Sequence, residues 1–428
     1  MKKLLCLGLF VLFAANMAFS EDGGEIKSRG DYLTVKVAVI GPGDELYFWW
    51  GHLGLIIEDA ITGRAHFIDY GVFSFRQTDF FSNFALGRLW YTTAESPAEA
   101  VIQRYIEDNR DITVYTLNLS AAQKEEMLAI TMHNLLPENS DYLYNHFSDN
   151  CVTRITNTLD AVLGGQFYAQ AANTPGRWTL RQEIRRFMAR HPVWDLLLNF
   201  WMGQVIDKQI SVKEEMFLPE ETGVFIENFT YIDADGNEQK LCGSIEKIWT
   251  AKNRPLFLDA PRSIFWTSLI VGIFLAALLY LVSPPYKRGK KTKKYAVLQK
   301  RLFGMGNTLL GLIGGIAGSL LFFMEFFSDH DYTYQNSNIL FANPLLLVAI
   351  PFGILFAFSR NEGKVRLATQ VLRILWTYVL LTALLAVIIK ILPAYYQDNW
   401  APLAIVIPIS LVLSKVPLGK GKGKRDDA

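Results

Sequence analysis

The apolar residues of this chain are concentrated after position 262, in runs that are long enough to cross a lipid bilayer. A membrane-spanning helix needs about 20 consecutive, mostly apolar residues. We predict five such helices, with four as the alternative because the last run is the shortest: 263–283, 302–325, 339–358, 369–392 and 401–416. The chain therefore divides into a helical membrane domain over 263–416 and a separate domain before it.

The segments between these runs differ in charge. Lysine and arginine are frequent at 287–294, at 360–366 and in the tail at 417–428, whereas 328–338 and 393–402 contain neither. Basic segments beside spans face the cytoplasm. With five spans, the N-terminal domain then lies outside and the C-terminus lies inside. Because topology explains the basic charge, we expect no nucleic-acid partner.

The first residues have the layout of a secretory signal peptide. A basic start is followed by an apolar run to Phe19 and a small-residue step at Ser20. We expect residues 1–20 to be removed, which independently places the next domain outside the cytoplasm. One of the three cysteines lies within this segment, so Cys151 and Cys242 remain in the mature chain.

Residues 25–260 mix strand and helix patterns, which predicts an α+β domain large enough to bury its own core. Period-two alternation with β-branched residues predicts strands at 32–40, 52–58, 66–70, 90–93 and 111–117. Helical spacing after a capping residue predicts helices at 120–136 and 150–163.

Cys151 falls in the first turn of the second of these helices, with Asp149 or Asn150 as its cap. A helix N-terminus stabilises negative charge, and the thiolate is the reactive form of cysteine. Cys151 is therefore a candidate nucleophile, and His52 on a predicted strand is a candidate general base. The competing interpretations are a buried structural histidine and a disulfide between Cys151 and Cys242.

A third polar group should orient the imidazole of His52. If the hairpin is centred on Ala60 and Ile61, Asp69 lies opposite His52. A shift of one residue puts Tyr70 opposite His52 instead, with His66 or Ile68 diagonal to His52. We favour Asp69, then His66.

Three strings resemble the Lnb N-terminal periplasmic domain family: Pro42 to His52, Phe67 to Phe75, and Tyr144 to Arg154. The resemblance implies a papain-like thiol fold in circularly permuted order, with His before Cys, similar to lecithin:retinol acyltransferase-type enzymes. It extends into the membrane part at His330, Asn336 and Asn338. One departure is Asp69, where the family pattern has Asn, so the role of the third residue stays open.

The resemblance also implies an acyltransferase, a lipoprotein N-acyltransferase in the bacterial inner membrane, with its N-terminal domain in the periplasm and its C-terminus in the cytoplasm. Cys151 would take an acyl chain from a glycerolipid as a thioester and pass it to the α-amino group of the N-terminal, lipid-modified cysteine of a lipoprotein. The expected partners are the glycerolipid donor, the lipoprotein acceptor and the membrane. We expect no cofactor and no metal, because the sequence has neither zinc-ligand spacing nor a phosphate-binding glycine motif.

Several further residues are candidates for supporting roles. Arg154 and Arg181 are suited to holding a lipid phosphate, with surface salt bridges as the alternative. His330, Asn336 and Asn338 are suited to a lipid headgroup site or to meeting Cys151 from the membrane side. The alternative for these three is an ordinary solvated loop.

Two other classes of function fit the same residues. A membrane-anchored hydrolase, either a lipid deacylase or a cell-wall amidase, would use the same Cys and His pair. A non-enzymatic receptor or scaffold would pair Cys151 with Cys242.

Overall fold

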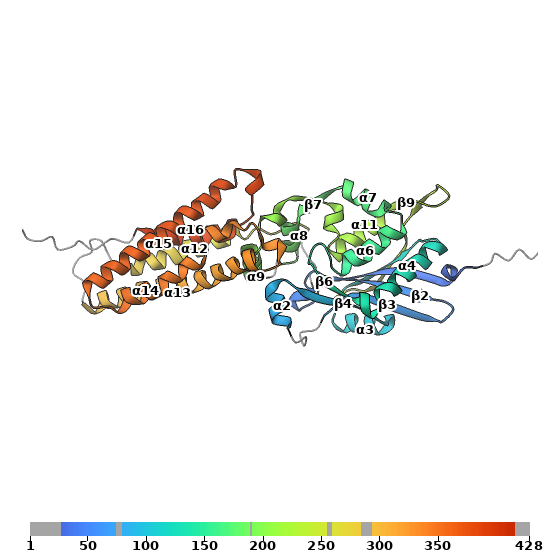
Figure 1. Ribbon diagram of the computed structural model, residues 1–428, viewed down its shortest axis with the longest axis horizontal. Coiled ribbons are helices and arrows are strands. Elements are labelled where there is room, and N and C mark those ends of the chain that lie inside the picture. The colour runs from blue at the N-terminus through green and yellow to red at the C-terminus, as the bar shows by residue number, and fades with distance from the viewer. Residues whose placement is uncertain (1–26, 74–78, 189–190, 255–258, 284–292, 416–428) are drawn as a thin grey trace, which may run out of the picture.

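The computed structural model describes residues 27–73, 79–188, 191–254, 259–283 and 293–415. The chain forms an N-terminal domain of sheet and short helices, with a bundle of long helices beside it (Figure 1). The predicted signal peptide at 1–20 and basic tail at 417–428 lie outside the described residues. So does most of the basic stretch at 287–294.

The N-terminal domain is built on a seven-stranded antiparallel sheet with the strand order β11-β5-β1-β2-β3-β4-β6. Its strands are β1 (Leu33–Ile40), β2 (His52–Asp59), β3 (Arg64–Val72), β4 (Leu89–Pro97), β5 (Ile112–Leu117), β6 (Asp141–Tyr144) and β11 (Cys242–Trp249). The five predicted strands are confirmed.

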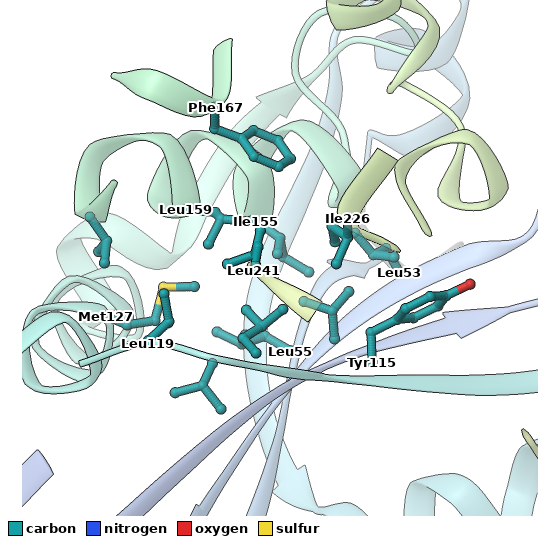
Figure 2. Close-up of a cluster of buried hydrophobic side chains, with 14 of the residues drawn as sticks. Leu53, Leu55, Tyr115, Leu119, Met127, Ile155, Leu159, Phe167, Ile226 and Leu241 are labelled. Atoms are coloured by element: carbon teal, nitrogen blue, oxygen red, sulfur yellow. The ribbon is translucent and has the colours of Figure 1, made fainter. Parts of the chain in front are cut away.

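Alternate side chains of the central strands point to opposite faces of this sheet, and both faces are buried. Val37 and Leu55 face a core formed with α4 (Ala121–Asn134), α6 (Cys151–Val162), α7 (Gln166–Asn173) and α11 (Pro219–Asn228), and Figure 2 shows part of this core. Ala38 and Ile56 face a smaller core formed with α3 (Ala98–Glu107). The sheet is therefore a layer between two sets of helices.

The two predicted helices begin where their capping residues place them. Ser120 accepts a hydrogen bond from the backbone of Gln123, and the Gln123 side chain accepts one from Ser120 in return. Asn150 is likewise the residue directly before its helix, and its side chain caps the N-terminus of α6. These caps satisfy amides that have no partner within the helix, so they fix the first residue of each helix.

The remaining elements join the sheet to the helical bundle. The helices are α2 (Phe80–Leu86), α5 (Pro137–Ser140), α8 (Leu180–Arg186), α9 (Pro192–Trp201) and α10 (Val212–Glu215). Two small antiparallel sheets pair β7 (Pro175–Thr179) with β8 (Gln209–Ser211), and β9 (Thr230–Ile232) with β10 (Glu238–Lys240). Figure 1 shows α8 and α9 on the side of the N-terminal domain that meets the bundle.

The helical bundle consists of α12 (Phe265–Val282), α13 (Lys293–Phe327), α14 (Ala349–Phe358), α15 (Glu362–Ile389) and α16 (Trp400–Ser414). Four segments of the described residues are long and apolar enough to cross a membrane: Phe265–Val282, Tyr295–Phe327, Ser337–Phe358 and Glu362–Ile389. The fifth predicted span forms the shorter helix α16, which packs against α12 and α15. The number of crossings therefore stays a prediction.

Glycines bring α13 and α14 into close contact. A Cβ atom on Gly304 would lie 2.6 Å from the carbonyl oxygen of Gly353, and one on Gly311 would lie 2.6 Å from the Cβ of Ala349. Small residues at such positions let helix backbones approach closely in membranes. The glycines of α13 are thus a packing surface.

Candidate active site

Cys151 is the first residue of α6 and its side chain is buried. The side-chain oxygen of Asn150 accepts hydrogen bonds from the amides of Val152 and Thr153, each at 2.9 Å. The amide group of Asn150 donates to the carbonyl oxygen of Phe217 at 3.0 Å. The cap therefore uses two of the helix amides, which leaves the backbone N–H of Cys151 itself to bind the oxyanion of an acyl group attached to the sulfur.

Cys151 and Cys242 are both free thiols. Cys242 begins β11 at the edge of the large sheet, whereas Cys151 is the first residue of α6 and lies in the core. The disulfide that the scaffold interpretation requires is absent from the described residues.

His52 and Asp69 form an ion pair across neighbouring strands. The Nε2 atom of His52, the first residue of β2, lies 3.0 Å from Oδ1 of Asp69 on β3. The same oxygen accepts a hydrogen bond of 2.6 Å from the amide of Gly71. Among the described residues Nε2 has no aligned hydrogen bond, so the contact is mainly electrostatic. The contact links His52, the predicted base, to Asp69, the favoured third residue.

The predicted register of this hairpin is wrong, although Asp69 still reaches His52. Leu55 pairs with Ile68 and Asp59 with Arg64, so the ladder continued toward His52 puts Gly71 opposite it. The loop is longer than predicted because the Asp59 side chain binds the amide and hydroxyl of Thr62. Asp69 lies diagonal to His52 on the same face of the sheet.

The corrected register separates the other two hairpin candidates from His52. His66 pairs with Ile57, and its Nδ1 atom contacts the carboxylate of Glu95. It lines a cavity of about 280 Å³ between the sheet and α4. The hydroxyl of Tyr70 accepts a hydrogen bond from Asn134 at 3.1 Å. Neither His66 nor Tyr70 is placed to orient the imidazole.

The electrostatics of the pair favour a charged imidazole. Burial lowers the pKa of His52, but the charges at Tyr105, Asp69 and Cys151 outweigh burial and raise it well above 6.5. Burial likewise raises the pKa of Asp69, but the contacts with His52, the amide of Gly71 and the charge of Arg110 together outweigh burial, so the pKa is lowered overall. The pair is therefore suited to holding a proton on the imidazole of His52.

His52 and Cys151 approach the end of the sheet from opposite faces. The His52 ring centroid lies 6.3 Å from that of Tyr105 on α3, whereas Cys151 packs with Leu53 on the α6 face. The two groups interact electrostatically, and no hydrogen bond joins them in the described part of the chain. Hydrogen bonds of catalytic groups are often long without substrate and shorten when it binds.

A second histidine, His146, lies close before Cys151 in the chain and was not predicted. Burial and then the charge of His330 lower the pKa of His146 to about 4. A group with such a low pKa is a weak base near neutral pH. His52 remains the better candidate for accepting a proton.

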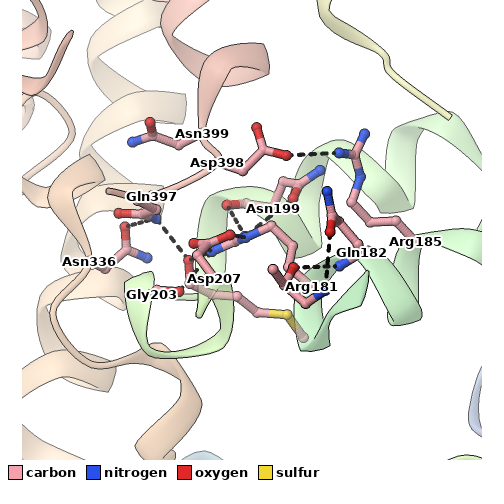
Figure 3. Close-up of polar contacts among 12 residues, drawn as sticks. Arg181, Gln182, Arg185, Asn199, Gly203, Asp207, Asn336, Gln397, Asp398 and Asn399 are labelled. Carbon is pink, nitrogen blue, oxygen red and sulfur yellow. Dashed lines mark hydrogen bonds and ion pairs between the residues drawn. The ribbon is translucent and has the colours of Figure 1, made fainter. Parts of the chain in front are cut away.

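The two candidate phosphate-binding arginines are occupied by protein groups. Arg154 makes a bidentate ion pair with Asp149 at 2.6 and 2.7 Å, and its guanidinium stacks 4.0 Å from the ring centroid of Tyr142. Arg181 is fully buried and binds Asp207 at 2.7 and 2.9 Å (Figure 3). It also donates to Asn199, Met202 and Gly203. Both arginines form salt bridges, but only that of Arg154 lies near the surface, as the alternative expected; that of Arg181 is buried.

Residues 328–338, which we call the docking loop, connect the bundle to the N-terminal domain. The two ring nitrogens of His330 each lie 2.8 Å from a partner, the carbonyl oxygen of Phe84 and the hydroxyl of Tyr332. The Tyr332 ring lies 5.3 Å from the His146 ring and 5.7 Å from the Phe147 ring. The docking loop therefore reaches the segment directly before Cys151.

Asn336 and Asn338 hold the docking loop against α9. The side-chain amide groups of Asn336 and Asn338 both donate to the carbonyl oxygen of Phe200 at 2.9 Å. Their side-chain oxygens accept from Gln397 at 3.0 Å and from Asn399 at 2.6 Å; Figure 3 draws the contact with Gln397. The two asparagines thus join the docking loop to the end of α9 and to the residues just before α16.

Arg110 is a buried residue near the site that the sequence did not reveal. Its Nε atom donates to the carbonyl oxygen of Gly41 at 2.9 Å, and its guanidinium lies between the rings of Phe48 and Tyr105. Its charge contributes to the low pKa of Asp69. Arginine after the turn at Asn109 has the pattern of a solvated loop, so only the fold could place it here.

The fold and the site together define a membrane-anchored α+β protein with a buried thiol at a helix N-terminus. Two family models match the chain, the Lnb N-terminal periplasmic domain at residues 27–185 and the Lnb transmembrane domain at residues 290–417. The chain belongs to the Lnb family, as its sequence strings predicted. No curated protein and no solved structure matches it.

Family membership indicates a membrane protein of lipoprotein processing with a periplasmic N-terminal domain. Family membership also indicates an enzyme that modifies lipoproteins. The described residues contain no group of three or more side chains suited to holding a metal ion.

Replacing Gly71 with alanine is expected to impair catalysis through His52. The added Cβ would lie 2.7 Å from Cε1 of His52, so the ring must move. A displacement of about 1 Å in a reacting group can cost about 100-fold in rate. The measurement is the rate at which the purified variant catalyses the reaction proposed below. Gly243→Ala is the matched control because its Cβ meets nothing closer than 3.4 Å, and equal activity of both variants would contradict the prediction.

The raised pKa of His52 predicts how stability depends on pH. A group with a raised folded pKa contributes stability that is complete below its unfolded pKa, about 6.5, and is lost as pH rises through the folded value. The difference in melting temperature between wild type and His52→Gln should therefore be constant below about pH 6.5 and should shift against wild type above it. Asp69→Asn should weaken this dependence, since its charge helps to raise the pKa. A difference in melting temperature between wild type and His52→Gln that does not vary with pH would contradict this prediction.

Proposed function

We propose that the protein is a lipoprotein N-acyltransferase that moves an acyl chain from a glycerolipid, through a thioester on Cys151, to the N-terminal amine of a lipid-modified lipoprotein. One observation carries the proposal: Tyr332 of the docking loop packs against His146 and Phe147, which lie five and four residues before Cys151. A nucleophile placed against the outer end of membrane helices is within reach of lipid esters. A soluble cell-wall substrate would not require that position.

In the first half-reaction the Cys151 thiolate attacks the ester carbonyl carbon of the lipid. The tetrahedral oxyanion accepts a hydrogen bond from the backbone N–H of Cys151 and is stabilised by the α6 dipole. When the carbon–oxygen bond breaks, the leaving alkoxide takes the proton of the His52 imidazolium. The products are a lyso-lipid and a thioester.

In the second half-reaction the neutral amine of the lipoprotein attacks the thioester carbonyl carbon. His52 accepts the proton of the amine as the carbon–nitrogen bond forms, and Cys151 leaves as the thiolate. Asp69 stabilises the imidazolium in both steps. The starting thiolate and imidazolium are regenerated, so no further reactant is needed.

The same proposal includes the location and orientation of the chain. The N-terminal domain lies on the periplasmic side of the inner membrane, and the C-terminus lies in the cytoplasm if α16 completes a fifth crossing. The docking loop, which lies on the same side as the N-terminal domain, contains no lysine or arginine, in agreement with the positive-inside rule.

Mass spectrometry of a reporter lipoprotein tests the proposal. Cells that lack the protein are complemented with wild type, Cys151→Ala or Cys242→Ser, and the N-terminal peptide is analysed for an N-linked acyl chain. Wild type and Cys242→Ser should add the chain, and Cys151→Ala should not. Restoration by Cys151→Ala would refute the thioester mechanism. An unchanged peptide in every strain would favour the hydrolase.

A further inference from the structure

Helix α2 is fixed to the beginning of the docking loop. The amide of Asp329 donates to the carbonyl oxygen of Leu86 at 2.8 Å, and Arg88 pairs with the Asp329 carboxylate at 2.7 Å. Gly87 adopts a left-handed φ of 76°, and a Cβ atom there would lie 2.7 Å from the backbone nitrogen of His330. The C-terminal end of α2 is therefore attached directly to residues 329 and 330.

This attachment places α2 next to the end of a candidate span. The candidate span Tyr295–Phe327 ends only two residues before Asp329. Two residues extend the chain by at most about 7 Å. The C-terminal end of α2 therefore lies beside the outer end of this candidate span, where its apolar residues stop at Phe327.

The side chains that α2 exposes fit a position at the end of a span. Phe81 and Phe84 are 79% and 51% exposed, and Phe326 and Phe327 at the neighbouring end of α13 are 60% and 63% exposed. Large aromatic side chains that are exposed at neighbouring helix ends are uncommon on proteins that face only water. They are typical of segments that lie in a membrane interface.

A continuous set of contacts leads from α2 to the segment before Cys151. The carbonyl oxygen of Phe84 contacts His330, and His330 contacts the hydroxyl of Tyr332. Tyr332 in turn packs against His146. The membrane-facing helix and the segment before the candidate nucleophile are thus joined through three side chains.

We propose that α2 lies in the periplasm-facing leaflet, with Phe81 and Phe84 among the acyl chains, and that a lipid reaches Cys151 past this helix. The position of α2 in the leaflet rests on its attachment to the docking loop beside the end of α13 and on its exposed phenylalanines, not on the proposed function. The passage of a lipid to Cys151 rests on the proposed function, and the two parts have separate tests.

Depth-dependent fluorescence quenching tests the position of α2. The full chain carries Cys6→Ser, Cys151→Ala and Cys242→Ser, and Phe81→Cys is labelled with an environment-sensitive fluorophore in lipid nanodiscs. Ile61→Cys is the matched control, because Ile61 is also an exposed apolar residue (59%) but lies in the β2–β3 loop. Lipids with a nitroxide near the headgroup should quench position 81 and leave position 61 unchanged. Aqueous iodide should do the reverse, and equal quenching of both positions by iodide would overturn the proposal.

The passage of lipid is tested with Phe81→Ser/Phe84→Ser against Ile61→Ser. Transfer from bilayer lipids should fall roughly tenfold in the double variant, because exposing polar groups to acyl chains is unfavourable. Hydrolysis of a short, water-soluble thioester and alkylation of Cys151 should be unchanged. Equal transfer by both variants would refute this part. If wild type transfers no acyl chain, the proposed function fails, and the fluorescence result still decides where α2 lies.

Discussion

Cys151→Ala is expected to reduce acyl transfer by about 1,000-fold or more, since removal of a nucleophile removes the covalent pathway entirely. The sulfur belongs to the first residue of α6, at the positive end of the helix dipole. Alanine keeps the buried methylene and leaves the Asn150 cap in place, so the fold should be preserved. The measurement is transfer by purified protein in detergent or nanodiscs.

Cys242→Ser is the control for this prediction. Cys242 is at the edge of the sheet, and its sulfur contacts the carbonyl oxygen of Ser244 at 3.7 Å. Burial raises the pKa of the Cys242 thiol, so it should react slowly with alkylating reagents at neutral pH. Transfer that depends on Cys242, or that survives in Cys151→Ala, would show that the nucleophile has been assigned incorrectly.

Arg181→Met is expected to destabilise the protein by about 3–5 kcal/mol, because it leaves the carboxylate of Asp207 buried without its partner. The side chains of Arg181 and Asp207 are 1% and 3% exposed. Arg181 also donates to the carbonyl oxygens of Met202 and Gly203, so the variant loses the contacts that join α8 to the segment after α9. Thermal unfolding of the purified protein measures the loss.

Arg154→Met is the matched control for this second prediction. Arg154 also makes a bidentate carboxylate pair, but its side chain is 28% exposed and that of its partner is 35% exposed. Exposed pairs contribute about 0–1 kcal/mol. A double variant, Arg181→Met with Asp207→Leu, should recover part of the lost stability. Equal destabilisation by the two arginine variants would contradict the argument from burial.

The local structure near the site was predictable because it depends on neighbouring residues. Alternation gave β2 to within one residue, and the capping pattern gave the start of α6 at Cys151. The register of the hairpin was not predictable from alternation. It depends on the side chain of Asp59 binding backbone and hydroxyl groups in the loop, which lengthens the loop.

The long-range contacts of the site could not be read from the sequence. Asn336 finds its partners at Phe200 and Gln397, which are far from it along the chain. Arg110 has the local pattern of an exposed residue, yet it is fully buried between two aromatic rings. Such contacts depend on the packing of whole domains, and no periodicity in the chain encodes them.

The carboxamide contacts of the docking loop have a consequence for the medium that surrounds this domain. Asn336, Asn338, Gln397 and Asn399 carry no charge at any physiological pH, and their hydrogen bonds are not screened by salt in the way that surface ion pairs are. The amide contacts should therefore persist in dilute or concentrated, acidic or alkaline surroundings, in which the exposed Arg88–Asp329 pair of the same loop would weaken.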